Sequence, residues 1–139
     1  MHKTTLAAVA SAALLAAAPA PARADVLAGG PVYGYPQQDQ FAGCFLFNAG
    51  PTAVALSGLA IVGPTGQAIS VGQNSCGPSL GPGQLCGLAG GIPRQGPYAC
   101  TVTTPAGAGA YLRGAVGVGT LLDPSDITVP LQLTPSPPG

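Results

Sequence analysis

Histidine, glutamate, lysine, tryptophan and methionine are all absent from residues 25–139, and the only histidine and lysine of the chain are at positions 2 and 3. A serine nucleophile normally works with an adjacent general base, and zinc sites are built mainly from histidine and cysteine. No Gly-x-Ser-x-Gly motif occurs. If the amino terminus is removed, as argued next, the sequence predicts a protein that is not an enzyme and holds no metal or other cofactor.

The amino terminus has the three parts of a secretory signal peptide. A positively charged start is followed by an apolar stretch at 6–18 and by Ala22-Arg23-Ala24, the small-x-small pattern that signal peptidase cuts. The apolar stretch is shorter than the roughly 20 residues of a membrane-spanning helix. We expect cleavage of residues 1–24 immediately before Asp25, with a cut after Ala22 as the alternative. The mature protein is then secreted or periplasmic, without stable membrane insertion.

The mature chain has little charge. Two arginines and four aspartates follow Ala24, which gives a net side-chain charge of −2. Binding to nucleic acid or to anionic lipid depends on clustered lysine and arginine. Two arginines cannot form such a cluster, so we expect a protein or another envelope component as the partner, and no nucleic acid.

Glycine and proline are abundant, with 22 and 16 residues in the chain. Such a composition without a fixed repeat is typical of disorder, but leucine, isoleucine, valine and phenylalanine form about a quarter of the mature chain, more than unfolded chains contain. The sequence therefore predicts one folded domain with many turns over residues 25–133. Residues 134–139, half of which are proline, are expected to form a disordered tail.

Short apolar runs bounded by turn residues predict strands, and no segment after Ala24 has ten residues of helical spacing free of glycine and proline. The predicted strands cover residues 40–48, 52–62, 67–71, 97–104, 110–120 and 127–133. Gly63-Pro64-Thr65-Gly66 has the proline and glycine positions of a type I turn, and Pro130 favours an edge position for the last strand. We expect two small antiparallel sheets packed face to face.

Four cysteines in a small exported domain predict two disulfides, for which three pairings exist. We favour Cys44 with Cys100 and Cys76 with Cys86. Residues 76–86 are rich in turn formers and can bring their own ends together, whereas Cys44 and Cys100 each lie within a predicted strand and can bridge two sheets. A zinc site is disfavoured because no Cys-x-x-Cys spacing and no nearby histidine occur.

Tyr98-Ala99-Cys100-Thr101-Val102 resembles strand F of immunoglobulin domains, in which a tyrosine lies two residues before the second bridging cysteine. Cys44 lies 56 residues before Cys100, where strand B would supply its partner. The tryptophan that packs on the disulfide in those domains is missing, and Leu56 or Leu59 is expected to fill its space. The resemblance implies an immunoglobulin-like β-sandwich.

Three turns extend the resemblance. Asn48-Ala49-Gly50, Pro64-Thr65-Gly66 and Leu80-Gly81-Pro82-Gly83 are similar in order to bacterial immunoglobulin-like, adhesion-related modules, in which an Asn-x-Gly turn precedes a glycine hairpin and a Leu-x-Pro-Gly turn. The run from Cys44 to Gly114 also resembles small exported bacterial proteins of uncharacterised function. These motifs mark strand ends, so the resemblance implies a fold and no active-site residues.

Three regions are candidate binding sites. Tyr33 and Tyr35 offer aromatic faces near the mature amino terminus, and tyrosine is favoured at interfaces. The alternative interpretation is that one tyrosine covers a sheet end while the other faces solvent. Arg94, between two prolines, or the loop of residues 76–86 could enter a protease cleft as a preorganised inhibitor loop does, although an ordinary turn is the simpler interpretation.

The remaining candidate chemistry is weak. Asp123-Pro124-Ser125-Asp126 holds two carboxylates, but an aspartate that opens a turn with proline second is ordinary turn chemistry, and four scattered aspartates are too few for a calcium site. Arg113 is expected to cover a sheet face or to pair with an aspartate. The sequence thus predicts an exported, non-enzymatic binding or envelope-structural module. The main alternative is a secreted protease inhibitor, and a hydrolase that relies on aspartates or serine alone is a weaker one.

Overall fold

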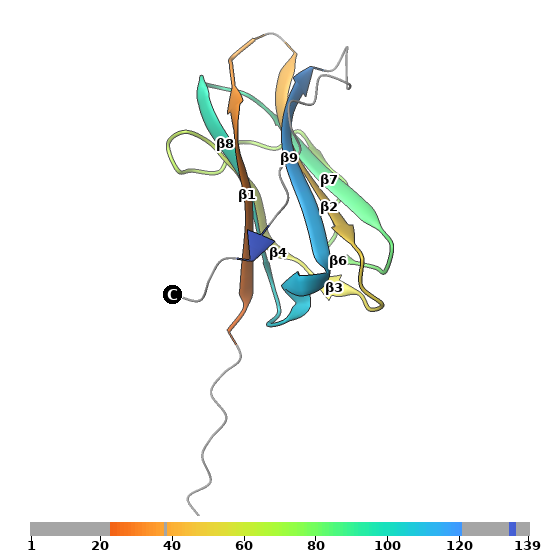
Figure 1. Cartoon of the computed structure of the whole chain (residues 1–139). Helices are drawn as coiled ribbons and strands as arrows, with labels where there is room; N and C mark the ends of the chain where they lie inside the picture. Colours follow the sequence, from red (N-terminus) through yellow and green to blue (C-terminus); the bar gives the residue numbers. More distant parts are fainter. Residues whose placement is uncertain (1–22, 38, 121–133, 136–139) are drawn as a thin grey trace, which may run out of the picture.

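The chain folds into two antiparallel sheets packed face to face (Figure 1). The computed structural model describes residues 23–37, 39–120 and 134–135. Sheet A has the strand order β10-β1-β8-β4, sheet B has the order β5-β7-β2-β9, and β3 pairs with β6. The elements are β1 (Asp25–Gly34), β2 (Gln40–Asn48), β3 (Val54–Ala55), β4 (Ser57–Val62), β5 (Gln73–Asn74), β6 (Ser79–Leu80), β7 (Leu85–Gly91), β8 (Gly96–Thr104), the 3-10 helix η1 (Ala108–Tyr111), β9 (Leu112–Thr120) and β10 (Thr134–Pro135).

Alternation along β2 and β8 builds the core between the sheets. Every second residue of each strand is buried, as expected for side chains that point alternately to the two faces of a sheet. The buried positions are Ala42, Cys44, Leu46 and Asn48 in β2, and Tyr98, Cys100, Val102 and Thr104 in β8. The predicted all-β sandwich without substantial helix is confirmed, since the four residues of η1 are the only helical ones in the described ranges.

Both favoured disulfides are confirmed. Cys44 on β2 is bonded to Cys100 on β8 and so links sheet B to sheet A, with a Cα–Cα distance of 5.6 Å. Cys76 is bonded to Cys86 at the start of β7, with a Cα–Cα distance of 4.9 Å. Two disulfides indicate an oxidising, extracytoplasmic environment. Within the described ranges, no helix has the length and apolar character needed to cross a lipid bilayer.

One segment, residues 67–76, which contains the two-residue strand β5, protects an edge of each sheet. At the free edge of β4, Gly63 N donates to Gln67 O and Ile69 N donates to Ile61 O, both at 2.9 Å. At the edge of β7 away from β2, where β5 also pairs, Gly72 N donates to Ala89 O at 3.0 Å and Ser75 N donates to Gly87 O at 2.8 Å. The segment therefore crosses from sheet A to sheet B and occupies backbone groups that another chain would otherwise pair with.

The strand boundaries differ from the prediction in several places. The strand predicted over 110–120 begins at Leu112, because η1 occupies Ala108–Tyr111. Residues 67–71 form only a bridge from Ala68 to Val62, because the chain turns away to reach sheet B. The single run predicted over 52–62 is divided, since β3 pairs with β6 whereas β4 pairs with β8. β1 and β7, two long glycine-containing strands, were not predicted.

Only some of the predictions for the two ends of the chain can be compared with the described residues. Residues 1–22 and 121–133 lie outside the described residues, so the signal peptide and the predicted strand at 127–133 stay predictions. The expected cleavage point lies immediately before β1, which begins at Asp25. Thr134 and Pro135, the first two residues of the expected disordered tail, form a short strand that pairs with β1.

Candidate functional site

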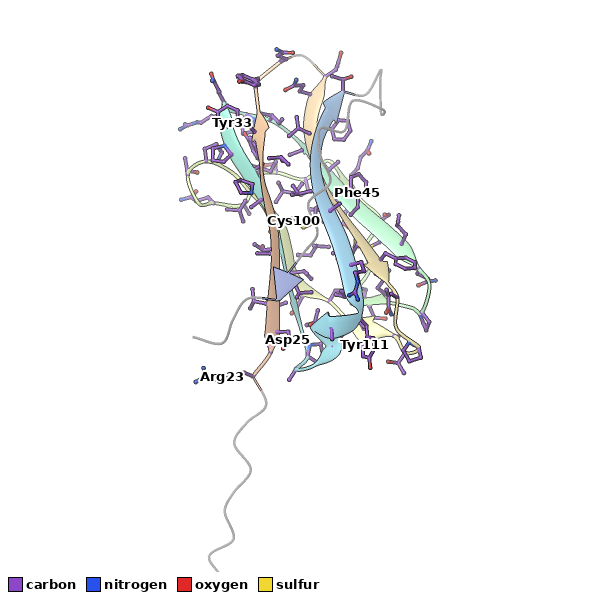
Figure 2. The ribbon with its side chains drawn as sticks, in the orientation of Figure 1. Arg23, Asp25, Tyr33, Phe45, Cys100 and Tyr111 are labelled. Carbon is purple, nitrogen blue, oxygen red and sulfur yellow. A yellow bond between two sulfur atoms is a disulfide. The ribbon has the colours of Figure 1, made fainter. Side chains whose placement is uncertain are left out.

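The outer face of sheet B carries all three phenylalanines of the chain. Phe41, Phe45 and Phe47 alternate with the buried residues of β2 and therefore point away from the core. Phe47 is 38% exposed, Phe41 and Phe45 are half-buried, and Leu85, directly across from Phe47 on β7, is 69% exposed. Figure 2 shows Phe45 on the side of the sheet turned away from Cys100. We call these four residues the aromatic face.

Small residues flank the phenylalanines on both neighbouring strands. Across from Phe41, Gly43 and Phe45, β7 places Gly91, Ala89 and Gly87, and β9 places Gly119, Gly117 and Ala115. The Phe45 ring lies directly on the glycine backbone, since a Cβ built on Gly87 would be 2.9 Å from its Cδ1 and one built on Gly43 would be 3.0 Å from its Cε2. The face is therefore a raised aromatic row with a low, partly exposed strip along β7, whereas Gly117 and Gly119 on the β9 side are buried.

Two adjoining grooves follow this face along β7. One has a volume of about 570 Å³ and is lined by Gln37, Asp39, Gln40, Phe41 and Gln73, together with backbone of β7. The other has a volume of about 500 Å³ and is bordered by Phe41, Phe45 and Leu85. Phe41, Gln73 and Ala89 border both grooves, so the two form one continuous depression.

Two opposite charges border the aromatic face. Asp39 precedes β2 and lines the larger groove, and its left-handed backbone, with φ 68°, is a conformation that aspartate adopts more readily than most residues. Arg113, on β9, lies directly across from Phe47 near the other end of β2. It does not pair with an aspartate in the described structure: its Nη1 donates to Ala110 O at 2.8 Å and to Leu112 O at 2.9 Å.

The two candidate tyrosines lie at the end of β1, away from the aromatic face. The rings of Tyr33 and Tyr35 contact each other, with centroids 5.3 Å apart and planes inclined by 59°. They are 56% and 47% exposed, and Figure 2 shows Tyr33 at the end of sheet A. Both rings therefore face solvent. The alternative, in which one ring covers a sheet end and only the other is exposed, does not describe this arrangement. They form a small aromatic surface.

Arg94 lies in the short connection from β7 to β8, where its backbone is held by Tyr98. The fully buried Tyr98 donates its hydroxyl proton to Arg94 O at 2.6 Å and accepts from Arg94 N at 3.4 Å. The arginine side chain is exposed beside a groove of about 390 Å³ formed mainly by residues 63–70. A protease inhibitor that binds like a substrate must offer the carbonyl of its central residue to the oxyanion hole. In Arg94 that carbonyl is already hydrogen-bonded.

The loop closed by Cys76 and Cys86 is attached to the domain rather than protruding from it. Leu80 is buried, and the fully buried Asn48 donates its side-chain amide to Leu80 O at 2.9 Å and to Thr52 O at 2.7 Å. The Asn48 side-chain oxygen accepts from Gly50 N at 2.9 Å, and its backbone bonds Gln84 and Gly83. The Asn-x-Gly and Leu-x-Pro-Gly turns, noted separately in the sequence, thus bind each other at one end of sheet B.

The described residues assemble no group of three or more histidine, cysteine, aspartate or glutamate side chains that could hold a metal ion. Asp25 accepts a hydrogen bond from Gly109 N at 3.1 Å and so ties β1 to η1. Asp123 and Asp126 lie outside the described residues. In this part of the chain, the geometry supports binding by shape and apolar contact.

The aromatic face was not identified from the sequence, although a signal was present. Phe41, Phe45 and Phe47 occupy odd positions of a strand whose even positions include Cys44, the residue expected to bridge the sheets. Period-two alternation then places the phenylalanines on the outside. Because Cys44 was expected to face the core, the odd-numbered residues of the same strand, including the three phenylalanines, could have been assigned to its outer face.

Comparisons with known proteins do not assign a family to the chain. No protein-family model matches it, no curated protein matches it, and no solved structure matches it.

Proposed function

We propose that the protein is an exported, non-catalytic binding or envelope-structural module that acts through the aromatic face of sheet B. The observation that carries the proposal is the placement of all three phenylalanines on the outside of one strand, over glycines and beside a continuous groove. A contiguous apolar surface on a small domain marks an interaction site. Export to the cell exterior or periplasm is supported by the two disulfides and by the signal-like amino terminus.

The proposed fold class is an immunoglobulin-like sandwich with a changed position of the end strands. In immunoglobulin domains strands B and E share one sheet and strands C and F share the other. β2 and β7 match B and E, β4 and β8 match C and F, and Tyr98 makes the backward hydrogen bond of a tyrosine corner. However, β1 pairs with β8, where strand G would lie, and β9 pairs with β2, where strand A would lie. We therefore infer an immunoglobulin-like core with its first and last strands exchanged.

The leucines expected to replace the missing tryptophan fit this proposal. Leu56 is buried within the core, and Leu59 is partly buried against it. Aliphatic side chains thus help to fill the region between the sheets.

The protease-inhibitor alternative has less support. Arg94 has its backbone N–H and carbonyl engaged by Tyr98, and the loop of residues 76–86 is held by Asn48. An inhibitor loop needs those backbone groups for the protease. A panel of trypsin-like enzymes tests this alternative, which would require stoichiometric inhibition that is lost in Arg94→Ala.

Site-specific photocrosslinking tests the proposed binding face. A photoreactive phenylalanine analogue is placed at Phe45 or Phe47 in sheet B and, as a matched control, at Thr101 or Thr103 on the outer face of sheet A. We expect adducts with an envelope component in the native envelope from the two sheet B positions and none from the sheet A positions. Equal adduct yields from the two faces, or no adduct from sheet B, would contradict the proposal.

A further inference from the structure

The charges that border the aromatic face lie at opposite ends of it. Asp39 is next to the start of β2, whereas Arg113 is across from Phe47, close to the end of β2. The Asp39 carboxylate accepts no hydrogen bond from any described residue, and the two hydrogen bonds of Arg113 both use Nη1. Each end of the face therefore presents one charged group that can bind a group of opposite sign.

We propose that the occupant of the aromatic face is a second copy of this chain, related by a two-fold axis so that the two β2 strands run antiparallel. This inference rests on the proposed function and names the partner. In such a pair the Asp39 end of one copy faces the Arg113 end of the other, and symmetry repeats the contact at both ends. Two-fold dimers are the commonest protein oligomers, and their interfaces are necessarily self-complementary.

The shape of the aromatic face is compatible with this packing. Sheets packed face to face in the aligned mode are inclined by about 30°, so two β2 strands cross near their centres. One end of each phenylalanine row then falls over the low strip of the other copy along β7, which consists of Gly87, Ala89 and Gly91. The phenylalanine at that end is accommodated there, and Phe45 lies near the crossing point.

The available area and charge also agree with a dimer. β2 and β9, with nine residues each, β7 with seven and β5 with two are spaced about 4.8 Å apart and offer roughly 450 Å² per copy, or about 900 Å² in the pair. That value lies below the range of stable interfaces and predicts a weak dimer. The mature chain, with two arginines and four aspartates, has a net side-chain charge of −2, so long-range repulsion between copies is small.

Sedimentation equilibrium of the purified exported protein tests the proposal through charge reversal. The wild type is expected to dimerise. Asp39→Arg or Arg113→Asp replaces attraction by repulsion at both symmetry-related contacts, so either should raise the dimer Kd by about tenfold or more. Combining the two substitutions restores complementary pairs, and we expect the Kd to return to within about threefold of the wild-type value. Circular dichroism confirms that each variant is folded.

Arg94→Asp is the matched control, because this exposed arginine lies in the connection between the sheets and does not border the aromatic face. It should leave the Kd unchanged. A monomeric wild type, a dimer insensitive to the single substitutions, or a double variant that does not recover would each overturn the proposal. If the crosslinked partner at Phe45 is a different envelope component, the proposed binding face stands and the self-association fails, so the two are distinguishable.

Discussion

The two sheets of this protein share one core and one disulfide, but their outer faces differ. The outward positions of β8 in sheet A are Pro97, Ala99, Thr101 and Thr103, whereas those of β2 in sheet B are Phe41, Gly43, Phe45 and Phe47. Threonine favours strands and tolerates water, so phenylalanine is not needed to form a strand at these positions. The contrast teaches that folding accounts for the inner residues of β2, whereas its outer phenylalanines are the residues for which we propose a role in binding.

The comparison requires that the two sheets stay in one domain. The largest expected effect on stability comes from removing the disulfide that links them. Replacing both Cys44 and Cys100 by alanine should lower the free energy of unfolding by about 4 kcal/mol, because the bridge closes a long loop and restricts the unfolded chain. Denaturant unfolding under non-reducing conditions measures this loss.

The matched control is the pair Cys76→Ala and Cys86→Ala. The sequence separation is 10 residues instead of 56, so the same loop-entropy model gives about 3 kcal/mol. A larger loss from the short bridge than from the long one would contradict the account of the long bridge as the main link between the sheets.

A second substitution disturbs one end of sheet B without touching its outer face. Asn48→Ala leaves the carbonyls of Leu80 and Thr52 and the N–H of Gly50 without their partner, and we expect a loss of about 2–4 kcal/mol in the free energy of unfolding. Asn74→Ala is the control, because this exposed side chain accepts one hydrogen bond, from Cys76 N. Urea titrations giving similar losses for both variants would refute the role assigned to Asn48.

On sheet A, Tyr98→Phe tests the tyrosine corner. Loss of the hydroxyl removes the hydrogen bonds to Arg94 O and from Arg94 N, and the free energy of unfolding should fall by about 1–1.5 kcal/mol. Tyr111→Phe, at an exposed ring, should cause almost no change. Thermal unfolding of the two variants compares them directly, and an equal shift in Tm would argue against a structural role for the Tyr98 hydroxyl.

The smallest expected effect on stability comes from replacing an outward phenylalanine of sheet B by threonine, a residue found at outward positions of sheet A. Phe47→Thr should change the free energy of unfolding by less than about 1 kcal/mol, since the ring is partly exposed and threonine favours strands. The adjacent buried position is the control: Leu46→Thr should cost about 3 kcal/mol, because it removes core contacts and buries a hydroxyl. If Phe47→Thr proves as destabilising as Leu46→Thr, the outer phenylalanine serves folding.

Strong local patterns allowed part of this fold to be predicted. β2 was predicted with its observed bounds and β8 to within one residue, because in both strands apolar residues alternate clearly and turn residues mark the ends. The disulfide pairing followed from the same pattern, since a cysteine inside each strand can bridge two sheets. These features need only short-range information.

β7 could not be predicted because its strand character comes from its neighbours. Its sequence, Leu-Cys-Gly-Leu-Ala-Gly-Gly, has low strand propensity, yet Gly87 is required where the Phe45 ring lies on it. The reverse holds for residues 67–71, which have an apolar pattern but form only a bridge to β4 before residues 72–75 pair with β7. Pairing with distant segments decided both cases, and one sequence does not reveal such pairing.

The candidate site was missed for a related reason. Tyr33, Tyr35 and Arg94 were chosen as chemically prominent residues next to turns, whereas the aromatic face is assembled from β2, β7 and β9, whose order in the sheet was unknown. Only the alternation along β2, with Cys44 at an even-numbered position and the phenylalanines at odd-numbered ones, could have indicated it.

Hydroxyl-radical footprinting tests the central claim, that sheet B is the binding face, most directly. Oxidation of Phe45 and Phe47 is compared between the native envelope and dilute purified protein, with Tyr33 on sheet A as the internal reference. The account predicts severalfold protection of the two phenylalanines in the envelope and an unchanged rate at Tyr33. Unchanged oxidation of the phenylalanines, or protection of Tyr33 instead, would contradict it.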